Sequence, residues 1–355
     1  MKIRTTLSTL TLIALGGLGA FAEPYSDASA IGFPKKTDIL VHFDNDSYKT
    51  SELVKHINAV SDKLPQQTKN ENGIDAILKE QNEKITSITC GFKLDDPEEK
   101  NVDGVGYIRG NGLDLKAIIQ SSKSQFNKDI SVQESKLCDK NCYLIAVKDS
   151  EVIAYLVQLD KKTIVCIVGN GSKKAEKSFK RLLKNREKGI GPKLAVKVKE
   201  NPMLVVYANG ANLPDNNGLE QGLVTVSESN SLLKVKADVM LKTAEEAQKN
   251  AQEALKDLQR ASMMLSFLGT QDNPSNFEKQ LLSMGAKTAA GAVVKNTDNR
   301  ISLTATCDVK EINTCIDAAI EEKIWEKYQT KSIPKDEDVF NNFDGIEEID
   351  ECVEE

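Results

Sequence analysis

The chain carries seven cysteines, the residues whose type and spacing could do chemistry. Cys138 and Cys142 bracket Asp139, Lys140 and Asn141, a polar segment that leads into an apolar strand pattern. A thioredoxin-type redox pair has about two intervening residues at a helix start, and zinc needs further ligands nearby, so the spacing disfavours both. The remaining chemistry is a small-loop disulfide, and we predict one between Cys138 and Cys142.

A second cysteine pair lies at a predicted strand-to-helix corner. Cys307 ends an apolar strand pattern, and Cys315 lies about two turns into the helix that follows, so we expect a disulfide staple there. Cys90 and Cys166 sit within apolar strand patterns and are typical of inert buried thiols. Cys352 lies in an acidic segment and is the odd cysteine of the set.

The segment Gly169-Asn170-Gly171-Ser172-Lys173 follows a predicted strand and opens a predicted helix, a place where backbone amides can hold a phosphate. It has neither Walker nor dinucleotide spacing, and Ser172 is also a good helix cap. The helix continues with lysines on its polar face, which is either a solvated surface or a salt-sensitive contact for an acidic partner, anionic lipid, polysaccharide or the chain's own tail. The candidate anion or partner contacts are Gly169, Gly171, Ser172, Lys173, Lys177, Lys180, Arg181 and Lys184.

Elsewhere the sequence shows no recognisable catalytic or cofactor motif. Asp44-Asn45-Asp46 resembles the start of a calcium loop, but Lys49 stands where glycine is required and Lys55 where a glutamate belongs. The only histidines are His42 and His56, and neither shares a local motif with a cysteine. We therefore expect no metal and no cofactor. The enzymatic alternative is a hydrolase with a carboxylate site between two halves of the chain.

Residues 1–22 have the features of a cleavable export signal. Lys2 and Arg4 precede an apolar stretch over residues 7–19, and Ala20-Phe21-Ala22 has the small-x-small pattern of a cleavage site. An uncleaved anchor would need about 20 apolar residues, and this stretch is shorter and interrupted by glycines. We expect a secreted protein of the periplasm or the cell exterior, without an integral membrane segment after cleavage, whose thiols meet an oxidising compartment.

Charge is unevenly distributed along the chain. Residues 336–355 contain ten acidic residues and no basic one, whereas the mature chain as a whole has a net charge of −8. The body before this tail is therefore close to neutral. Nucleic acid binding requires a concentrated positive surface, so we expect no nucleic acid partner.

Strand and helix patterns alternate up to Lys188-Gly189-Ile190-Gly191-Pro192, where glycine and proline mark a boundary, and then begin again. We predict an N-terminal α+β domain over residues 23–188, a C-terminal α+β domain over 193–330 and an acidic, disordered tail over 331–355. Two hairpin strands followed by a capped helix recur in the chain. This internal repeat predicts an α+β fold of duplicated modules, with antiparallel sheets and helices packed on one face. The alternative is a doubly wound parallel sheet.

The longest predicted helix begins at Thr243, which forms a capping box with Glu246. Its expected buried stripe consists of Ala247, Ala251, Leu255, Leu258 and Leu265. Met263, Met264, Phe277 and Trp325 lie at helical spacing and are likewise expected to be core residues.

Three further segments carry a resemblance. The strand Thr37–Asp44, the glycine-bearing corner Tyr107-Ile108-Arg109-Gly110 and the restart at Pro202-Met203-Leu204-Val205-Val206, together with the export signal, resemble uncharacterised exported proteins of planctomycete-type bacteria. The resemblance implies a two-part α+β fold and carries no functional residues. The expected role is a non-enzymatic binding or scaffold protein of the periplasm or cell surface, with a protein or envelope component as partner.

Overall fold

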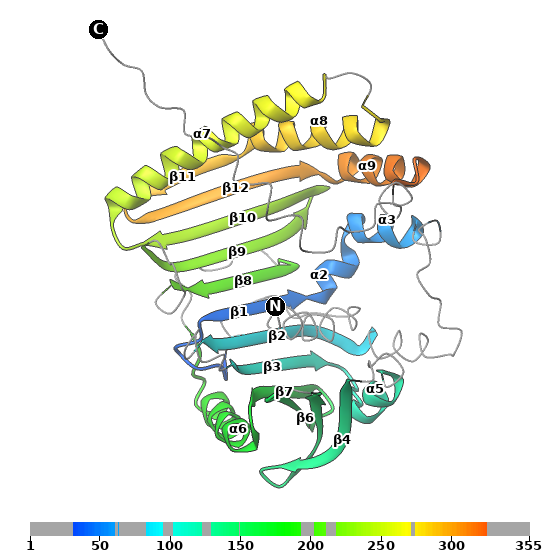
Figure 1. The fold of residues 1–355 in the computed structure, drawn as a ribbon, viewed down its shortest axis with the longest axis vertical. Coiled ribbons are helices and arrows are strands. Elements are labelled where there is room, and N and C mark those ends of the chain that lie inside the picture. Colours follow the sequence, from blue (N-terminus) through cyan, green and yellow to red (C-terminus); the bar gives the residue numbers. More distant parts are fainter. Residues whose placement is uncertain are drawn as a thin grey trace.

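A computed structural model of the chain describes residues 31–60, 63, 83–94, 102–122, 129–148, 150–192, 202–210, 218–270 and 274–324. Twelve strands form one sheet in the order β11-β12-β10-β9-β8-β1-β2-β3-β7-β6-β5-β4 (Figure 1). Every neighbouring pair is antiparallel. The predicted α+β class with antiparallel pairing is therefore confirmed, and the parallel alternative is not the fold.

The elements have the following bounds. The strands are β1 (Ile39–Asp44), β2 (Ile85–Leu94), β3 (Val102–Gly110), β4 (Ile130–Leu137), β5 (Lys140–Val147), β6 (Val152–Asp160), β7 (Thr163–Asn170), β8 (Leu204–Asn209), β9 (Leu219–Ser229), β10 (Leu232–Leu241), β11 (Val293–Thr297) and β12 (Arg300–Asp308). The helices are α2 (Asn45–Thr50), α3 (Glu52–Val60), α5 (Leu115–Ser122), α6 (Ser172–Glu187), α7 (Ala244–Leu268), α8 (Asn276–Gly291) and α9 (Val309–Glu321).

The first strand, β1, lies at the middle of the sheet. Val41 of β1 is opposite Cys90 of β2 on one side and opposite Val206 of β8 on the other. β8 is the first strand after the glycine and proline boundary at residues 188–192. The two halves of the chain therefore share a single hydrogen-bonded sheet.

A hairpin followed by a helix recurs four times along the chain. The units are β2-β3-α5, β6-β7-α6, β9-β10-α7 and β11-β12-α9, and the two strands of each unit pair with each other. The recurrence has a local cause, because strands that follow each other closely in the chain pair antiparallel. In three of the units a side chain then caps the helix, namely Asp114 for α5, Thr243 for α7 and Asp308 for α9. In the last unit, Asp308 accepts a hydrogen bond from the Lys310 N–H and begins α9.

Side chains alternate between two faces of the sheet, and helices cover parts of both. On the first face, Val165 and Ile167 of β7 pack with Phe179 of α6. On the second face, Ile164 packs with Ile119 of α5. Further along the second face, α7 lies over the β10, β11 and β12 end of the sheet, with a small core of Leu241, Ala247, Ala251 and Ile301.

Three elements were not expected from the sequence, namely β4, which is mostly polar, α2 and α8. The apolar residues Leu53, Val54, Ile57 and Val60 predict a helix over about residues 50–63, and α3 lies within this range. Some expectations fall outside the described residues. The export signal, most of the predicted helix over residues 74–84, Trp325, Cys352 and the acidic tail lie outside the described ranges.

All six described cysteines are free, so the structure contains neither predicted disulfide. The turn between β4 and β5 is made by Cys138 and Asp139, both with positive φ, as in the two-residue turns that favour hairpins. The turn is shorter than predicted, because Lys140 already belongs to β5. Cys142 therefore lies within a strand and not at the end of a polar turn. Cys138 Sγ instead lies 4.0 Å from the Glu176 carbonyl oxygen of α6.

The second predicted disulfide, between Cys307 and Cys315, is also absent. Cys307 Sγ lies 3.8 Å from the carbonyl oxygen of Asp308, and Cys315 is a buried thiol of α9. Burial raises the pKa of the Cys315 thiol, and a neighbouring Cys307 thiolate would raise it further. Burial also raises the pKa of the Cys307 thiol, so both groups are protonated, unreactive thiols near neutral pH.

Candidate functional site

The helical hairpin of α7 and α8 is the candidate binding surface. Thr243 caps α7 by accepting a hydrogen bond from the Glu246 N–H, as the sequence predicts. Ser275 caps α8 through a complete capping box with Glu278. Both helices thus have well-defined starts, and the Ser262 hydroxyl ties α7 to α8 by donating to the Ala286 carbonyl oxygen at 3.1 Å.

Only the N-terminal half of α7 packs on the sheet. Ala247 and Ala251 are buried there, and their small side chains allow the helix to approach β10 and β12 closely. These two members of the predicted buried stripe are confirmed. Leu255, the next member, is 41% exposed, which marks the point where the packing against the sheet ends.

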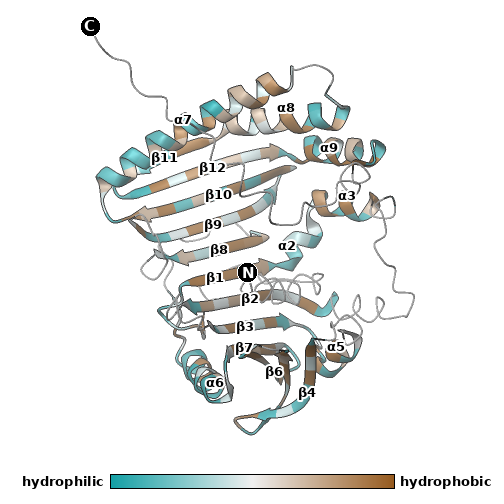
Figure 2. Cartoon of the chain, in the orientation of Figure 1, coloured by the Kyte–Doolittle hydropathy of each residue, from teal (hydrophilic) through white to brown (hydrophobic). Residues whose placement is uncertain are grey.

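The C-terminal half of α7 carries exposed apolar side chains. Met263, Met264 and Phe267 are 65%, 59% and 63% exposed, so the expectation that Met263 and Met264 belong to the core is wrong. The reason is the direction of α7, which runs at an angle to β12, so that its C-terminal half has α8 as its main neighbour (Figure 1). Figure 2 shows hydrophobic residues on this end of the hairpin, next to the polar N-terminal end of α7. Leu268 and Leu281 extend the exposed apolar surface.

A shallow groove of about 470 Å³ runs between the two helices on this hairpin. It exists because small residues line it and because Gly285 of α8 leaves room for Leu265, whose methyl carbon would lie only 3.1 Å from a Cβ at that position. The lining residues are Ser262, Leu265, Ser266, Gly269, Thr270, Lys279, Ser283, Ala286, Lys287 and Ala290. The groove and the exposed side chains of Met263, Met264, Phe267, Leu268 and Leu281 together form what we call the hairpin surface.

The helical hairpin as a whole is nearly neutral, although the lining of the groove contains two lysines, Lys279 and Lys287, and no acidic residue. Residues 244–291 contain six acidic and five basic residues. Lys287 donates to Glu311 of α9 at 2.5 Å, so one of the two groove lysines is already paired. In the described part of the chain, no helix combines the length and the apolar character that crossing a bilayer requires.

The predicted anion or partner contacts lie on and before α6, at the opposite end of the sheet (Figure 1). Gly169 is buried inside β7, and Gly171 rather than Ser172 is the N-cap of α6, with φ +83° and no capping side chain. Lys173, Lys177, Lys180 and Lys184 are exposed. The four lysines thus form a solvent-exposed strip along α6. Gly171 has a structural role, because its positive φ shapes the turn between β7 and α6.

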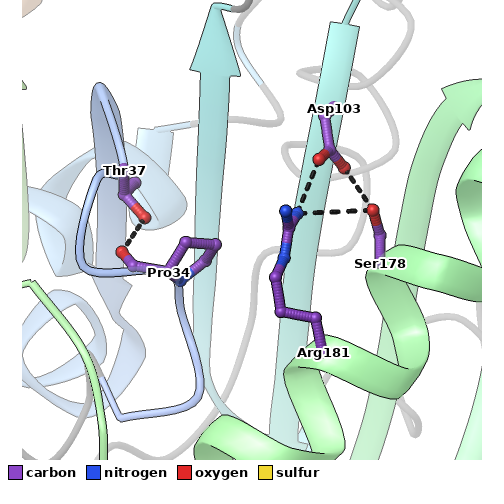
Figure 3. A network of polar contacts seen from close by, with 5 residues as sticks. All are labelled: Pro34, Thr37, Asp103, Ser178 and Arg181. Atoms are coloured by element: carbon purple, nitrogen blue, oxygen red, sulfur yellow. Dashed lines mark hydrogen bonds and ion pairs between the residues drawn. The ribbon is translucent and has the colours of Figure 1, made fainter.

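Arg181, the remaining candidate contact, is bound within the protein. Its Nη2 donates to Asp103 Oδ2 at 2.6 Å, and the Ser178 hydroxyl donates to Asp103 Oδ1 at 2.7 Å (Figure 3). Asp103 is on β3, so the carboxylate joins α6 to the sheet. Arg181 therefore holds α6 in place and is not a free cation of the strip.

Replacement of Asp103 by asparagine is expected to lower the free energy of unfolding by about 1–2 kcal/mol, because a half-exposed charged pair and a charged hydrogen bond are lost. Urea unfolding followed by circular dichroism would measure it. Glu176→Gln is the matched control, since it removes only the exposed Lys180 pair at 3.7 Å and should change stability by less than about 0.5 kcal/mol. Equal effects of the two substitutions would contradict the anchoring role of Asp103.

Two buried carboxyl groups have shifted pKa values, but they do not form a catalytic pair. Burial raises the pKa of Asp44 on β1. For Asp238 on β10 burial acts in the same direction, yet hydrogen bonds from Lys236, Ser302 and Arg300 hold its pKa below the usual range. β8 and β9 lie between the two strands, a separation of about 14 Å. Paired carboxyls in glycoside hydrolases are about 5–9.5 Å apart, so these two groups do not supply the hydrolase alternative.

Each of the two histidines contacts another side chain. His42 is fully buried in β1, with Nδ1 2.8 Å from Thr89 Oγ1, and His56 Nε2 of α3 lies 3.0 Å from Asp317 Oδ1 of α9. Across the described residues, no three His, Cys, Asp or Glu side chains are grouped as a metal-binding cluster.

Comparison with known proteins identifies no family for this chain. No protein family model matches it, and no curated protein matches it. Among solved structures, crystal form I of TP0453 aligns with a TM-score of 0.38 and 11% identity over 85% of this chain and 98% of that chain. Crystal forms III and IV of TP0453 align with TM-scores of 0.40 and 11% identity, covering 84% and 83% of this chain and 98% and 96% of those chains. None of these comparisons supports the resemblance to planctomycete-type proteins.

Proposed function

We propose that the chain is an exported binding or scaffold protein of the periplasm or cell surface, and that the hairpin surface is where its partner docks. The observation that carries the proposal is the exposure of Met263, Met264 and Phe267 on a well-capped helix, next to a groove. A contiguous group of large apolar side chains on a protein surface usually marks an interaction site. The export signal remains the basis for the proposed location.

The partner proposed is a protein that presents an amphipathic helix. A groove between two helices accepts the apolar face of a third helix, with anchors at helical spacing. Methionine suits such a contact because its flexible, polarisable side chain adapts to different partners. Phe267 supplies the rigid anchor, since aromatic residues dominate the binding energy of many interfaces.

The charge of the hairpin favours a protein over a membrane surface. Helices that lie on membranes usually present a polar face rich in Lys and Arg toward anionic headgroups. Residues 244–291 have slightly more acidic than basic residues, so electrostatic attraction to such headgroups is weak. The groove is lined by two lysines, and because Lys287 is paired with Glu311, little positive charge is left there to select anionic headgroups over a partner helix.

Capture from an envelope fraction by the full mature chain tests the proposal. A double Met263→Ser and Phe267→Ser variant should capture the partner at least about tenfold less, because each lost anchor weakens binding by about 1–2 kcal/mol. Lys173→Gln with Lys177→Gln on α6 is the matched control and should capture the partner as the unmodified chain does. Undiminished capture by the hairpin variant would refute the proposed site.

Co-sedimentation with lipid vesicles distinguishes a protein partner from a membrane surface. The chain is mixed with phosphatidylcholine vesicles and with vesicles that contain an anionic lipid, and co-sedimentation is measured. We expect the unmodified chain and the double Met263→Ser and Phe267→Ser variant to sediment with the vesicles to the same extent. Sedimentation that disappears in the double serine variant would mean that the hairpin surface binds lipid instead of a protein helix.

A further inference from the structure

Four exposed lysines lie along one side of α6. They are spaced by four, three and four residues, which places them on a single face of the helix. Seven of the sixteen residues of α6 are basic and two are acidic, so the helix as a whole is strongly positive. We call the four lysines the α6 strip: Lys173, Lys177, Lys180 and Lys184.

The α6 strip has few acidic neighbours that could neutralise it. Lys180 lies 3.7 Å from Glu176, an exposed pair of a kind that contributes little to stability. In the part of the chain that the structure describes, no carboxylate lies at ion-pair distance from the other three lysines of the strip. Like charges three or four residues apart on a helix repel each other, so the strip destabilises α6.

The start of α6 departs from the pattern of the other long helices. α7, α8 and α9 each have a capping side chain and an acidic residue in the first turn. α6 has neither, and Lys173 and Lys174 stand in its first turn, where the helix dipole favours negative charge. Sequences that break such local rules usually do so where function requires it. A negatively charged partner along the α6 strip would offset both unfavourable terms.

The same chain contains a segment of complementary charge. Residues 336–355, the acidic tail, contain ten acidic residues and no basic one. We propose that the acidic tail docks on the α6 strip of its own chain. The carboxylates of the tail then supply the negative charge that α6 lacks, through several exposed ion pairs that are each weak and act together.

The tail is long enough to reach the strip. α9 and α6 lie toward opposite ends of the sheet, and the strands that precede them, β12 and β7, are seven strand spacings apart, about 34 Å (Figure 1). The described residues end at Ile324, and twenty residues beyond it span up to about 68 Å when extended. Residues 345–355 then remain for the contact, and they carry six carboxylate side chains.

Docking within one chain is favoured over docking between two copies. A linker of this length holds the tail near the strip at an effective concentration on the order of 0.1–1 mM, well above that of a second copy in a micromolar solution. The contact consists of exposed charges, so salt screens it. An acidic partner from outside the chain would have to displace the tail before it could bind the α6 strip.

Carbodiimide cross-linking of the full mature chain, followed by mass spectrometry, locates the tail. The reagent joins a carboxylate to a lysine amine where the two groups meet. In about 20 mM NaCl, cross-links from the acidic tail to the α6 strip should be at least about fivefold more abundant than those to Lys279, and they should fall about tenfold in about 500 mM NaCl. Lys279 is the sharp comparison, because it is exposed on α8, which packs on α9, the helix after which the tail follows.

Three outcomes of this experiment would overturn the proposal. The first is that Lys279 reacts with the tail as often as the α6 strip does, and the second is that salt leaves the cross-links to the strip unchanged. The third uses a micromolar mixture of isotopically labelled and unlabelled chains. Cross-links that join a labelled to an unlabelled chain would place the tail on a second copy.

Cleavage of the tail by a glutamate-specific protease tests the role of the charges. A docked tail is cleaved slowly, and glutamine at all four positions of the α6 strip should speed its cleavage at least about threefold at low salt. Arginine at the same four positions keeps the charge and should keep cleavage slow. Because the four lysines are exposed, none of these changes removes a core contact, and circular dichroism checks that the variants fold.

A control variant removes four positive charges at exposed positions elsewhere and should be cleaved at the rate of the unmodified chain. Its substitutions are Lys116→Gln, Lys249→Gln, Lys256→Gln and Lys279→Gln. Equal acceleration in this control would mean that overall charge, and not the α6 strip, sets the rate. That result, or unchanged cleavage when the strip carries glutamine, would refute docking on α6.

Discussion

Acidification to pH 4 is expected to destabilise the protein by about 3 kcal/mol through His42 alone. Burial, with a smaller contribution from Arg109, lowers the pKa of His42 from 6.5 to about 3. Above pH 6.5 the histidine is neutral in both the folded and the unfolded chain, so its contribution to stability is complete. As the pH falls from 6.5 to about 3, the unfolded chain binds a proton that the folded chain does not, and stability is lost progressively.

The buried position explains why the folded protein resists this proton. His42 is 0% exposed between Thr89 of β2 and Val205 of β8. A charged imidazolium there would lose its hydration and would be repelled by the positive charge of Arg109. The same site therefore makes β1, the strand that joins the two halves, sensitive to acid.

Urea unfolding from pH 7.5 to pH 4 measures the effect. His42→Gln removes the titrating group and should flatten the dependence of stability on pH by about 3 kcal/mol over this range, even if it lowers stability at pH 7.5. His56→Gln, which removes the half-buried histidine beside Asp317, should keep the steep acid dependence. A His42→Gln profile as steep as that of the unmodified chain would show that other groups cause the acid sensitivity.

The sequence predicts the strands of the sheet well where they are apolar on both faces. Apolar patterns predict strands over residues 85–94, 152–158 and 163–168, and the structure has β2 at Ile85–Leu94, β6 beginning at Val152 and β7 beginning at Thr163. The sequence does not predict β4 because this strand has no strongly apolar face. Such a pattern is typical of an edge strand, and β4 lies at one edge of the sheet. Local patterns also predicted the caps at Thr243 and Asp308.

The candidate site was predicted only in part, because periodicity does not show what lies opposite a helix face. Ala247, Leu255 and Met263 all lie at helical spacing, yet only the first meets the sheet. The second half of α7 leaves the sheet because the helix runs at an angle to β12 (Figure 1), and this angle is a tertiary property that helical spacing does not show.

Phe179→Ala is expected to lower the free energy of unfolding by about 3–5 kcal/mol. Phe179 lies on α6, is 0% exposed and packs in the core that contains Val165, Ile167 and Leu182. Truncation removes its contacts and leaves a cavity that the surrounding strands cannot fill, since β3, β6 and β7 are held in register by hydrogen bonds.

Phe267→Ala gives the matched comparison, because it makes the same chemical change at a position that is 63% exposed. Its effect on stability should stay within about 0.5 kcal/mol, while capture of the partner falls. Urea unfolding of both variants, together with the capture assay on Phe267→Ala, separates the two roles. If Phe267→Ala were as destabilising as Phe179→Ala, the C-terminal half of α7 would be a packed core element, and the hairpin surface would not be free to bind a partner.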